Sequence, residues 1–452
     1  MSAVADTGIS VAVDQNEYLA EGARTVDAIV TVEITEALTV AVPQQERVEI
    51  LIIDCSGSMG TGDKFAGARR ATLAALDVLP DGTRFAIVEG TDKAKVVFPL
   101  DGTTAAADAY SRAAARKTLD TLRPHGGTAI GTWLGLSRKI AKKHPGAMVH
   151  AILLTDGRNE HEKPERLAAE IRASEGVFTC DCRGVGTDWE PAELRAVASG
   201  LLGTADMVRT PDLLAEDFAA MMETSMAKAI PDLTLRVWTP QSDRVTFVKQ
   251  VAPSIEDLTG RRSELSAQIG EYPLGSWGAE DRDYHVQIQV QPAPAGSEKL
   301  AARISVVAGT EIIGQGLVKA VWTTDTDLSA RISRRVAHYT GQAELAQAVQ
   351  EGLAARKKGD IPTATAKLQR AMQLAAESGN DATAKLLSAV VEVDEHGTVR
   401  IRTHVDPADE RALDMRSGTT ARVRKEDAAA VTAKVRADAV DATARVRKEA
   451  GA

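Results

Sequence analysis

Nearly unbroken apolar stretches restrict most strongly the folds open to this chain of 452 residues. The stretch RVEILIIDCS at residues 47–56 has apolar side chains at consecutive positions, and MVHAILLTDG at residues 148–157 repeats the pattern. Consecutive apolar residues are typical of a strand that is buried on both faces, as in a parallel sheet with helices on either side. Further strands alternate with segments of helical spacing, which predicts a doubly wound α/β domain at residues 46–229.

The other predicted elements of this domain follow in a regular order. Strands are expected at TRFAIVEG, KVVFPL, GVFTCDCRGVG and TADMVRT, and helices at residues 63–79, 104–122, 129–143 and 163–174. In a doubly wound sheet, ligands bind beyond the carboxyl ends of the strands. The loops that follow the apolar strands are therefore the expected position of a functional site.

Two of these loops, and a third loop between them, carry oxygen-bearing side chains. The first apolar strand continues into Asp54, Ser56 and Ser58, followed closely by glycines. The segment PHGGTAIGTWL brings Thr128 to the start of a helix, and the second apolar strand ends at Asp156. Alternate residues of an extended loop point to the same side, and glycine permits a close approach of the backbone. Asp, Ser and Thr offer hard oxygen ligands, which suit Mg²⁺ or Mn²⁺.

The DCSGSMG loop, the separate Thr128 and LLTDG together resemble the metal-ion-dependent adhesion site (MIDAS) of von Willebrand factor type A (VWA) domains, of the intracellular bacterial type. All five ligand positions of that site are filled, in order along the chain. The resemblance implies that Ser56, Ser58 and Thr128 coordinate the cation directly. It also implies that Asp54 and Asp156 coordinate directly or through water, and that an Asp or Glu of a protein partner completes the shell.

The resemblance predicts a non-catalytic adaptor that binds its partner through the divalent cation. The alternatives are a metal-dependent hydrolase or phosphatase, and an accessory subunit of a separate ATPase. A phosphatase of the haloacid-dehalogenase type needs a second acid two positions after the first, where this chain has Ser56. A nucleophile elbow at CSGSMG would need a base, and neither His150 nor His161 lies in a triad context. The segment NEHEKPE is interpreted as a solvated charged loop rather than a set of metal ligands.

Composition argues against several other functions. A net charge of −9 gives no general attraction to nucleic acid. The apolar stretches are far shorter than a bilayer span and the first residues lack a signal-peptide pattern, so we expect a cytoplasmic protein without membrane insertion. The three cysteines, Cys55, Cys180 and Cys182, are too few for a disulfide framework and are expected in the core.

Alternating apolar and polar residues on both sides of the α/β domain predict an antiparallel β-sandwich into which that domain is inserted. Its strands are expected at residues 1–45 and 230–324. Trp238, Trp277 and Trp322 are predicted to be core or edge aromatic residues of this sandwich.

Two shorter regions follow the sandwich. Helical spacing with a Gly-Asp turn predicts a small helical bundle at residues 325–390. The alternating segment VVEVDEHGTVRIRT predicts a β-hairpin at residues 391–404.

Residues 405–452 contain no aromatic side chain and are expected to form a disordered tail. The near-repeats TARVRKED, TAKVRADA and TARVRKEA begin at Thr420, Thr432 and Thr443. Each threonine precedes a valine by three residues, which resembles the phosphothreonine motif bound by forkhead-associated domains. We regard these threonines as candidate substrates of a Ser/Thr kinase. The alternative is a marginal helix with a period near eleven residues.

Overall fold

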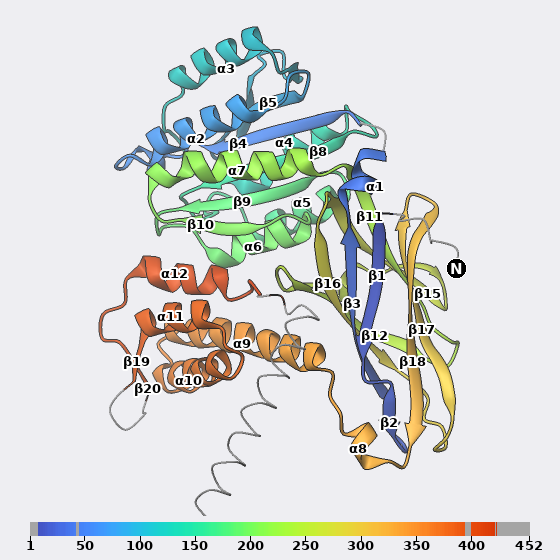
Figure 1. The fold of residues 1–452 in the computed structure, drawn as a ribbon. Coiled ribbons are helices and arrows are strands. Elements are labelled where there is room, and N and C mark those ends of the chain that lie inside the picture. The colour runs from blue at the N-terminus through green and yellow to red at the C-terminus, as the bar shows by residue number, and fades with distance from the viewer. Residues whose placement is uncertain (1–7, 42–44, 394–398, 421, 423–452) are drawn as a thin grey trace, which may run out of the picture.

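The computed structural model describes residues 8–41, 45–393, 399–420 and 422. Figure 1 shows an α/β domain, a β-sandwich beside it, and a group of helices below the α/β domain. The predicted fold class is confirmed: a mostly parallel α/β sheet is accompanied by antiparallel sheets and C-terminal helices.

The sheet of the α/β domain has the order β10–β9–β8–β4–β5–β6. Its strands are β4 (Arg47–Asp54), β5 (Arg84–Gly90), β6 (Ala94–Phe98), β7 (Ala105–Ala106), β8 (Met148–Thr155), β9 (Thr179–Val185) and β10 (Ala205–Val208). Neighbours from β10 to β5 are parallel, whereas β6 and β7 pair with β5 in the antiparallel direction. The prediction of a parallel sheet fails only at this edge, because the connection from β5 to β6 is too short for a crossover helix.

Helices cover both faces of this sheet (Figure 1). They are α2 (Lys64–Val78), α3 (Ala109–Thr121), α4 (Ile130–Ala141), α5 (Pro164–Ser174), α6 (Pro191–Gly200) and α7 (Leu214–Ala227). Along β4, Ile52 joins the buried cluster that contains Trp133 of α4, while Ile53 joins the cluster that contains Phe218 of α7. Because alternate residues face opposite helical layers, the strand is apolar throughout. Helices α6 and α7 were not predicted from the sequence.

The sandwich consists of two sheets around one buried apolar cluster. One sheet has the order β1–β3–β16–β12–β13 and the other β14–β15–β11–β17–β18–β2. Their strands are β1 (Ile9–Gln15), β2 (Tyr18–Ala20), β3 (Thr25–Ile34), β11 (Ile230–Trp238), β12 (Arg244–Ala252), β13 (Glu256–Asp257), β14 (Ser263–Ser266), β15 (Ile269–Trp277), β16 (Asp281–Gln289), β17 (Glu298–Ala308) and β18 (Glu311–Thr323); the short helix α1 (Glu36–Ala41) follows β3. Strands from before and after the α/β domain thus pair within the same sheets, which is the arrangement of an inserted domain.

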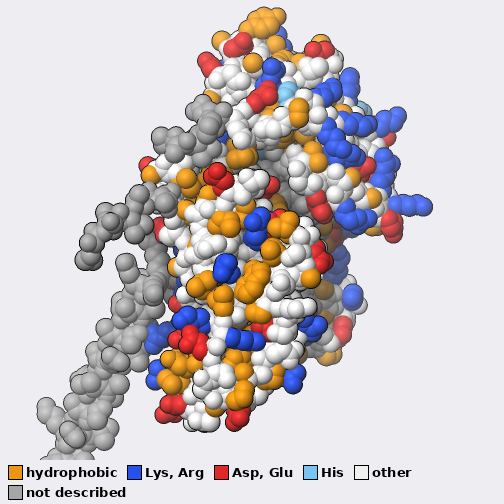
Figure 2. All heavy atoms as spheres, turned by 90° about the vertical axis from the view of Figure 1, so that its right-hand side faces the viewer, with side chains coloured by type: hydrophobic (Ala, Val, Ile, Leu, Met, Phe, Trp, Pro, Cys, Tyr) orange, Lys and Arg blue, Asp and Glu red, His pale blue; other side chains and the backbone are white. Residues whose placement is uncertain are grey.

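The three tryptophans predicted for the sandwich lie in or beside its core. Trp277 and Trp322 are fully buried, and Trp238 is half-buried. The Arg282 guanidinium lies 4.2 Å from the ring centroid of Trp277, a distance at which a cation interacts with the ring. On the outer face shown in Figure 2, hydrophobic side chains are interspersed with charges of both signs over the sandwich, while Lys and Arg side chains gather at one side of the upper part.

The C-terminal region is helical. It comprises α8 (Thr326–Ser329), α9 (Arg334–Lys357), α10 (Ile361–Glu377), α11 (Asp381–Val390), the hairpin strands β19 (Val391–Val393) and β20 (Val399–Ile401), and α12 (Pro407–Arg416). Helices α9 and α10 pack together on either side of a turn in which Gly359 has a φ of 78°, a conformation that glycine adopts readily. The strands β19 and β20 are antiparallel.

Helix α12 corrects the prediction that the whole of residues 405–452 is disordered. Its first turn is capped by Asp406, whose side chain accepts a hydrogen bond from the Ala408 N–H. Leu413 and Met415 are buried against the rest of the molecule. A helix of this length gains its stability from packing rather than from propensity, and composition alone does not reveal such packing. Thr432 and Thr443 lie outside the described residues.

No helix in the described part of the chain is both long enough and apolar enough to cross a membrane.

Candidate metal centre

The predicted ligands lie at the topological switch point of the α/β sheet. Asp54 is the last residue of β4, and Asp156 directly follows β8, its neighbour in the sheet. The chain leaves β4 toward β5 on one side and reaches β8 on the other, so the loops after these two strands diverge. In open α/β sheets, ligands bind at such a point of divergence.

The first loop is held by both carboxylate oxygens of Asp54. Its Oδ1 accepts a hydrogen bond from the Ser56 N–H at 2.7 Å, and its Oδ2 accepts one from the Thr155 hydroxyl at 2.5 Å. Burial raises the pKa of Asp54 to about 6, although these hydrogen bonds act in the opposite direction. A cation at this position would favour the ionised carboxylate that burial disfavours. Thr155 was not predicted from the sequence as part of this site.

Backbone hydrogen bonds join the second loop to the first. The Gly57 N–H donates to the Gly126 carbonyl at 3.0 Å, and the His125 N–H donates to the Cys55 carbonyl at 2.7 Å. Gly126 adopts a φ of 67° in this turn. These contacts bring Thr128, at the end of the second loop, to the same edge of the sheet.

The third loop caps the N-terminus of α4 and so fixes Thr128. The Asn159 side-chain oxygen accepts from the Ile130 N–H at 2.7 Å, and Glu162 accepts from the Gly131 N–H at 2.5 Å. His161 Nδ1 accepts from the Thr128 N–H at 3.1 Å. These residues satisfy the free N–H groups of the helix start. The interpretation of NEHEKPE as a solvated loop is therefore wrong for Asn159 and Glu162, whose side chains are buried.

Oxygen-bearing side chains of all three loops lie close together. Ser58 Oγ lies 2.9 Å from Ser56 Oγ and 2.8 Å from Asp156 Oδ1. A Cβ placed on Gly157 would lie 2.8 Å from Thr128 Oγ1 and 3.4 Å from Ser58 Oγ, so these two oxygens lie on the same side of Gly157.

The burial of this oxygen cluster suits a bound cation. Asp54 and Asp156 are fully buried, Ser56 and Thr128 are nearly so, and Ser58 is exposed. A cluster of oxygens that is closed on the protein side and open at one point fits a hard divalent cation with a free coordination position.

Lys64 is an unpredicted member of this site. Its ammonium group lies 2.7 Å from Asp156 Oδ2 and 3.1 Å from Asp188 Oδ2, and its side chain is mostly buried. The pKa of Lys64 is raised: burial alone would lower it, but the hydrogen bond and charge of Asp156 outweigh burial. The ammonium thus neutralises one of the two buried carboxylates of the site.

Replacing Lys64 with methionine is expected to tighten Mn²⁺ binding by about tenfold, because the variant has no ammonium group that repels the cation or pairs with the Asp156 carboxylate. Calorimetric titration of the wild type and of the Lys64→Met variant measures the change. Lys117→Met, on the exposed side of α3, serves as the control and should leave the affinity unchanged. An unchanged or weaker affinity in Lys64→Met would contradict this role.

The other polar clusters do not have the character of a cation site. Cys180 and Cys182 are buried with their sulfurs 4.0 Å apart, and Cys55 is buried apart from them. Among the described residues, no three His, Cys, Asp or Glu side chains are arranged to hold a metal. At the candidate site only Asp54 and Asp156 are of these residue types, since Ser56, Ser58 and Thr128 carry hydroxyl groups.

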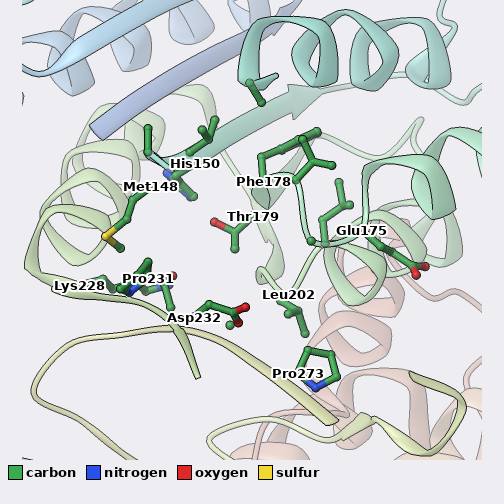
Figure 3. A pocket seen from close by; sticks show the side chains of 18 of the residues that line it. Met148, His150, Glu175, Phe178, Thr179, Leu202, Lys228, Pro231, Asp232 and Pro273 are labelled. Carbon is green, nitrogen blue, oxygen red and sulfur yellow. The ribbon is translucent and has the colours of Figure 1, made fainter. Parts of the chain in front are cut away.

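A second polar cluster lies at the opposite, amino-terminal edge of the sheet. His150 of β8 is buried between Glu49 Oε2, 2.7 Å away, and Asp181 Oδ2, 2.9 Å away. The two carboxylates raise the pKa of His150 to about 9, against the opposing effect of burial. His150 lines a cavity of about 880 Å³ between the α/β domain and the sandwich, with Lys228 and Asp232 on the opposite wall (Figure 3).

Comparisons with known proteins agree with this architecture. Residues 50–212 match the family model of the von Willebrand factor type A domain, and residues 373–417 match that of the von Willebrand factor type A C-terminal domain. A solved structure described as von Willebrand factor type A from Catenulispora acidiphila is 48% identical, with a TM-score of 0.88, over 92% of this chain and 97% of that one.

Two more distant relatives match different shares of this chain. The ArnB paralog VWA2 from Sulfolobus acidocaldarius has a TM-score of 0.57 at 13% identity over 91% of this chain and 98% of that one, which shows a shared fold. An uncharacterised protein of Synechocystis sp. is 28% identical over 214 residues, 46% of this chain. The chain spans about half the length, 49%, of that curated relative.

The fold defines a doubly wound α/β domain in which oxygen-bearing side chains gather at the carboxyl edge of the sheet. Together with the similarity to the Catenulispora acidiphila structure, they show that this chain belongs to the von Willebrand factor type A domain family.

Proposed function

We propose that this protein is a non-catalytic adaptor that binds a protein partner through a divalent cation, Mg²⁺ or Mn²⁺, at a complete MIDAS. The observation that carries the proposal is the convergence of oxygens from three loops at the carboxyl edge of the sheet. The residues that would hold the cation are Asp54, Ser56, Ser58, Thr128 and Asp156. VWA domains are metal-dependent protein-interaction modules, which agrees with this role.

The charge of the site supports a partner with an acidic side chain. With Lys64 paired to Asp156, the buried groups of the site carry a net charge of about −1, so a divalent cation retains positive charge. When bound, such a cation supplies a Lewis-acidic position that a carboxylate can occupy. The exposed Ser58 marks the side from which an Asp or Glu of the partner would approach.

The geometry offers no support for the alternative of a metal-dependent hydrolase or phosphatase. Within the described residues, no histidine side chain is hydrogen-bonded to the hydroxyl of Ser56 or Ser58. His161 instead accepts from the backbone of Thr128, and His150 lies at the opposite edge of the sheet. No described histidine is therefore positioned as a base for nucleophilic chemistry, and the carboxylate that accepts from Ser58, Asp156, is already paired with the Lys64 ammonium. A role as accessory subunit of a separate ATPase stays compatible with an adaptor.

The experiment that tests the adaptor proposal is affinity capture from native cell extract with the tagged full chain, with Mg²⁺ or with EDTA. Partners should be retained in Mg²⁺, lost in EDTA and regained when Mg²⁺ is restored. Asp54→Asn should retain none of them in Mg²⁺, whereas Asp63→Asn, an exposed change at the start of α2, should retain all. Equal retention by Asp54→Asn and wild type would contradict the proposal.

The tail is proposed as a second, regulatory contact. Phosphorylation of Thr420, Thr432 or Thr443 by a Ser/Thr kinase would add about 1.5 to 2 negative charges at each site. A forkhead-associated domain is the proposed reader of the modified threonines. The free thiols of Cys55, Cys180 and Cys182 agree with the cytoplasm as the proposed location.

A further inference from the structure

The chain that follows α12 is fastened to the sandwich by a short set of residues, Gly418, Thr419, Thr420 and Arg422, which we call the latch. The Ile255 N–H donates to the Gly418 carbonyl at 2.8 Å, and the Thr420 N–H donates to the Pro253 carbonyl at 3.0 Å. Thr419 forms a bridge with Ser254. The latch therefore extends the backbone pairing of the sandwich beyond the end of β12.

An ionic cluster built around the buried Asp283 anchors the end of the latch. Arg422 pairs with Asp281, and its Nε lies 3.2 Å from Asp283 Oδ2. Asp283 is fully buried and also pairs with Arg335 at 2.6 Å. Asp283 therefore keeps one guanidinium partner if Arg422 is removed, whereas losing Asp283 would leave two arginines without their shared carboxylate. Arg422 is thus the point at which the latch can be weakened without damage to the core.

The two neighbouring threonines of the latch have opposite environments. The Thr419 side chain is exposed, whereas Thr420 is 8% exposed and its hydroxyl donates to the Val251 carbonyl. A kinase needs the hydroxyl of its substrate free, because the catalytic base accepts the hydroxyl proton. Thr420 does not meet this condition while its hydroxyl donates to the Val251 carbonyl and its N–H to the Pro253 carbonyl.

We propose that Thr420 is a gated phosphorylation site, hidden by the latch and modified only after the latch detaches. In that step, a Ser/Thr kinase transfers the γ-phosphoryl group of a nucleoside triphosphate. The bond between the γ-phosphorus and its bridging oxygen breaks, Thr420 Oγ1 forms a bond to that phosphorus, the hydroxyl proton passes to the kinase, and the nucleoside diphosphate leaves. This proposal deepens the proposed role of the tail, and it distinguishes Thr420 from Thr432 and Thr443.

The modified threonine cannot return to its original position. A phosphate would place about 1.5 to 2 negative charges against the carbonyl oxygens of Val251 and Pro253, which are acceptors and offer it no hydrogen bond. Phosphorylation therefore holds the latch open. Helix α12 keeps its other attachments, since Asp414 pairs with Arg195 of α6 at 2.6 Å and Glu410 pairs with Arg356 of α9. Opening thus frees the motif beginning at Thr420 without unfolding the helix before it.

Phosphorylation kinetics test the gate. A Ser/Thr kinase is first chosen for its activity on a synthetic peptide of residues 416–427, and is then applied with MgATP to the full chain. We expect Thr420 in the full chain to be modified at least about tenfold more slowly than in the peptide, because only the opened fraction is available. Arg422→Ala should recover most of that loss. The same rate in the full chain and in the peptide would overturn the proposal.

Hydrogen exchange at the Ile255 amide tests the consequence, because that amide reports directly on the bond to Gly418. Thr420→Glu and the phosphorylated chain should both lose about tenfold or more of its protection. Thr419→Glu, one residue away and exposed, should retain it. Unchanged protection after modification at Thr420 would overturn the latch.

Thr443, in the similar segment TARVRKEA, is the internal reference for the general tail proposal. If Thr443 and Thr420 are both phosphorylated in the full chain, and Thr420 as fast there as in the peptide, the latch proposal is overturned. The tail proposal would then stand. Absence of phosphate on all three tail threonines in native cells would remove the tail proposal, while slow modification of Thr420 in vitro would still support the gate.

Discussion

Replacing Asp54 with asparagine is expected to weaken the binding of Mg²⁺ or Mn²⁺ by at least about a hundredfold, which corresponds to about 2.7 kcal/mol. The site contains two buried carboxylates and the Lys64 ammonium. Without the charge of Asp54, Lys64 would neutralise the remaining Asp156, so the cation would enter a site with no net negative charge. Calorimetric titration of both proteins measures the loss.

The Asp54→Asn chain should still fold. Because burial raises the pKa of Asp54 to about 6, keeping this carboxylate ionised at neutral pH costs the folded, metal-free protein free energy relative to the unfolded chain. The thermal midpoint of the metal-free variant should therefore be no lower than that of the metal-free wild type. Asp63→Asn, an equal change of charge on an exposed residue, should bind as the wild type does. Wild-type affinity in Asp54→Asn would remove Asp54 from the site.

Replacing His150 with glutamine is expected to destabilise the α/β domain by about 3 kcal/mol near pH 6. The reason is that Glu49 and Asp181 would lose the cation that lies between them. Their remaining hydrogen-bond donors, Ser225 for Glu49 and Thr204 for Asp181, are neutral. The charges of Lys228 and Arg183 also act on Asp181, but less strongly than His150 does. Denaturant unfolding followed by tryptophan fluorescence measures the free energy of unfolding.

The pH dependence of this loss has a defined sign. The folded state raises the pKa of His150 from 6.5 to about 9, so the stabilisation is fully present below pH 6.5 and is lost as pH rises through 9. The difference between wild type and His150→Gln should therefore shrink as the pH is raised toward 9 and beyond. His404→Gln, on an exposed histidine, should change stability by less than about 0.5 kcal/mol. A loss that stays constant from pH 6 to pH 10 would contradict a charged His150.

The parallel core of the α/β domain could be predicted because each of its strands has a recognisable pattern of apolar residues within its own segment. Residues such as Ile52 and Ile53 face different helical layers, and the resulting continuous apolar pattern needs two covered faces. Helix α12 was missed for the opposite reason. Its buried side chains Leu413 and Met415 pack against elements distant in sequence, and nothing within the segment itself specifies that packing.

In the candidate site, too, some residues could be predicted from the sequence and others could not. The five proposed oxygen ligands follow apolar strands or begin a helix, so their types and spacing could be interpreted directly from the sequence. Thr155, Lys64 and Asn159 could not, because each acts through a partner that only the fold brings near. Lys64 in particular begins a helix after the first loop, yet it pairs with an acid 92 positions later in the chain.

The most direct test of the central claim is a crystal structure of the full chain grown with Mn²⁺, in which anomalous scattering locates the ion independently of any assumed site. We predict one strong anomalous peak at the site formed by Asp54, Ser56, Ser58, Thr128 and Asp156. A peak that lies elsewhere in the molecule, with the Lys64 ammonium still paired to Asp156 in an ion-free site, would contradict the proposal that this protein acts through a divalent cation at the edge of its sheet.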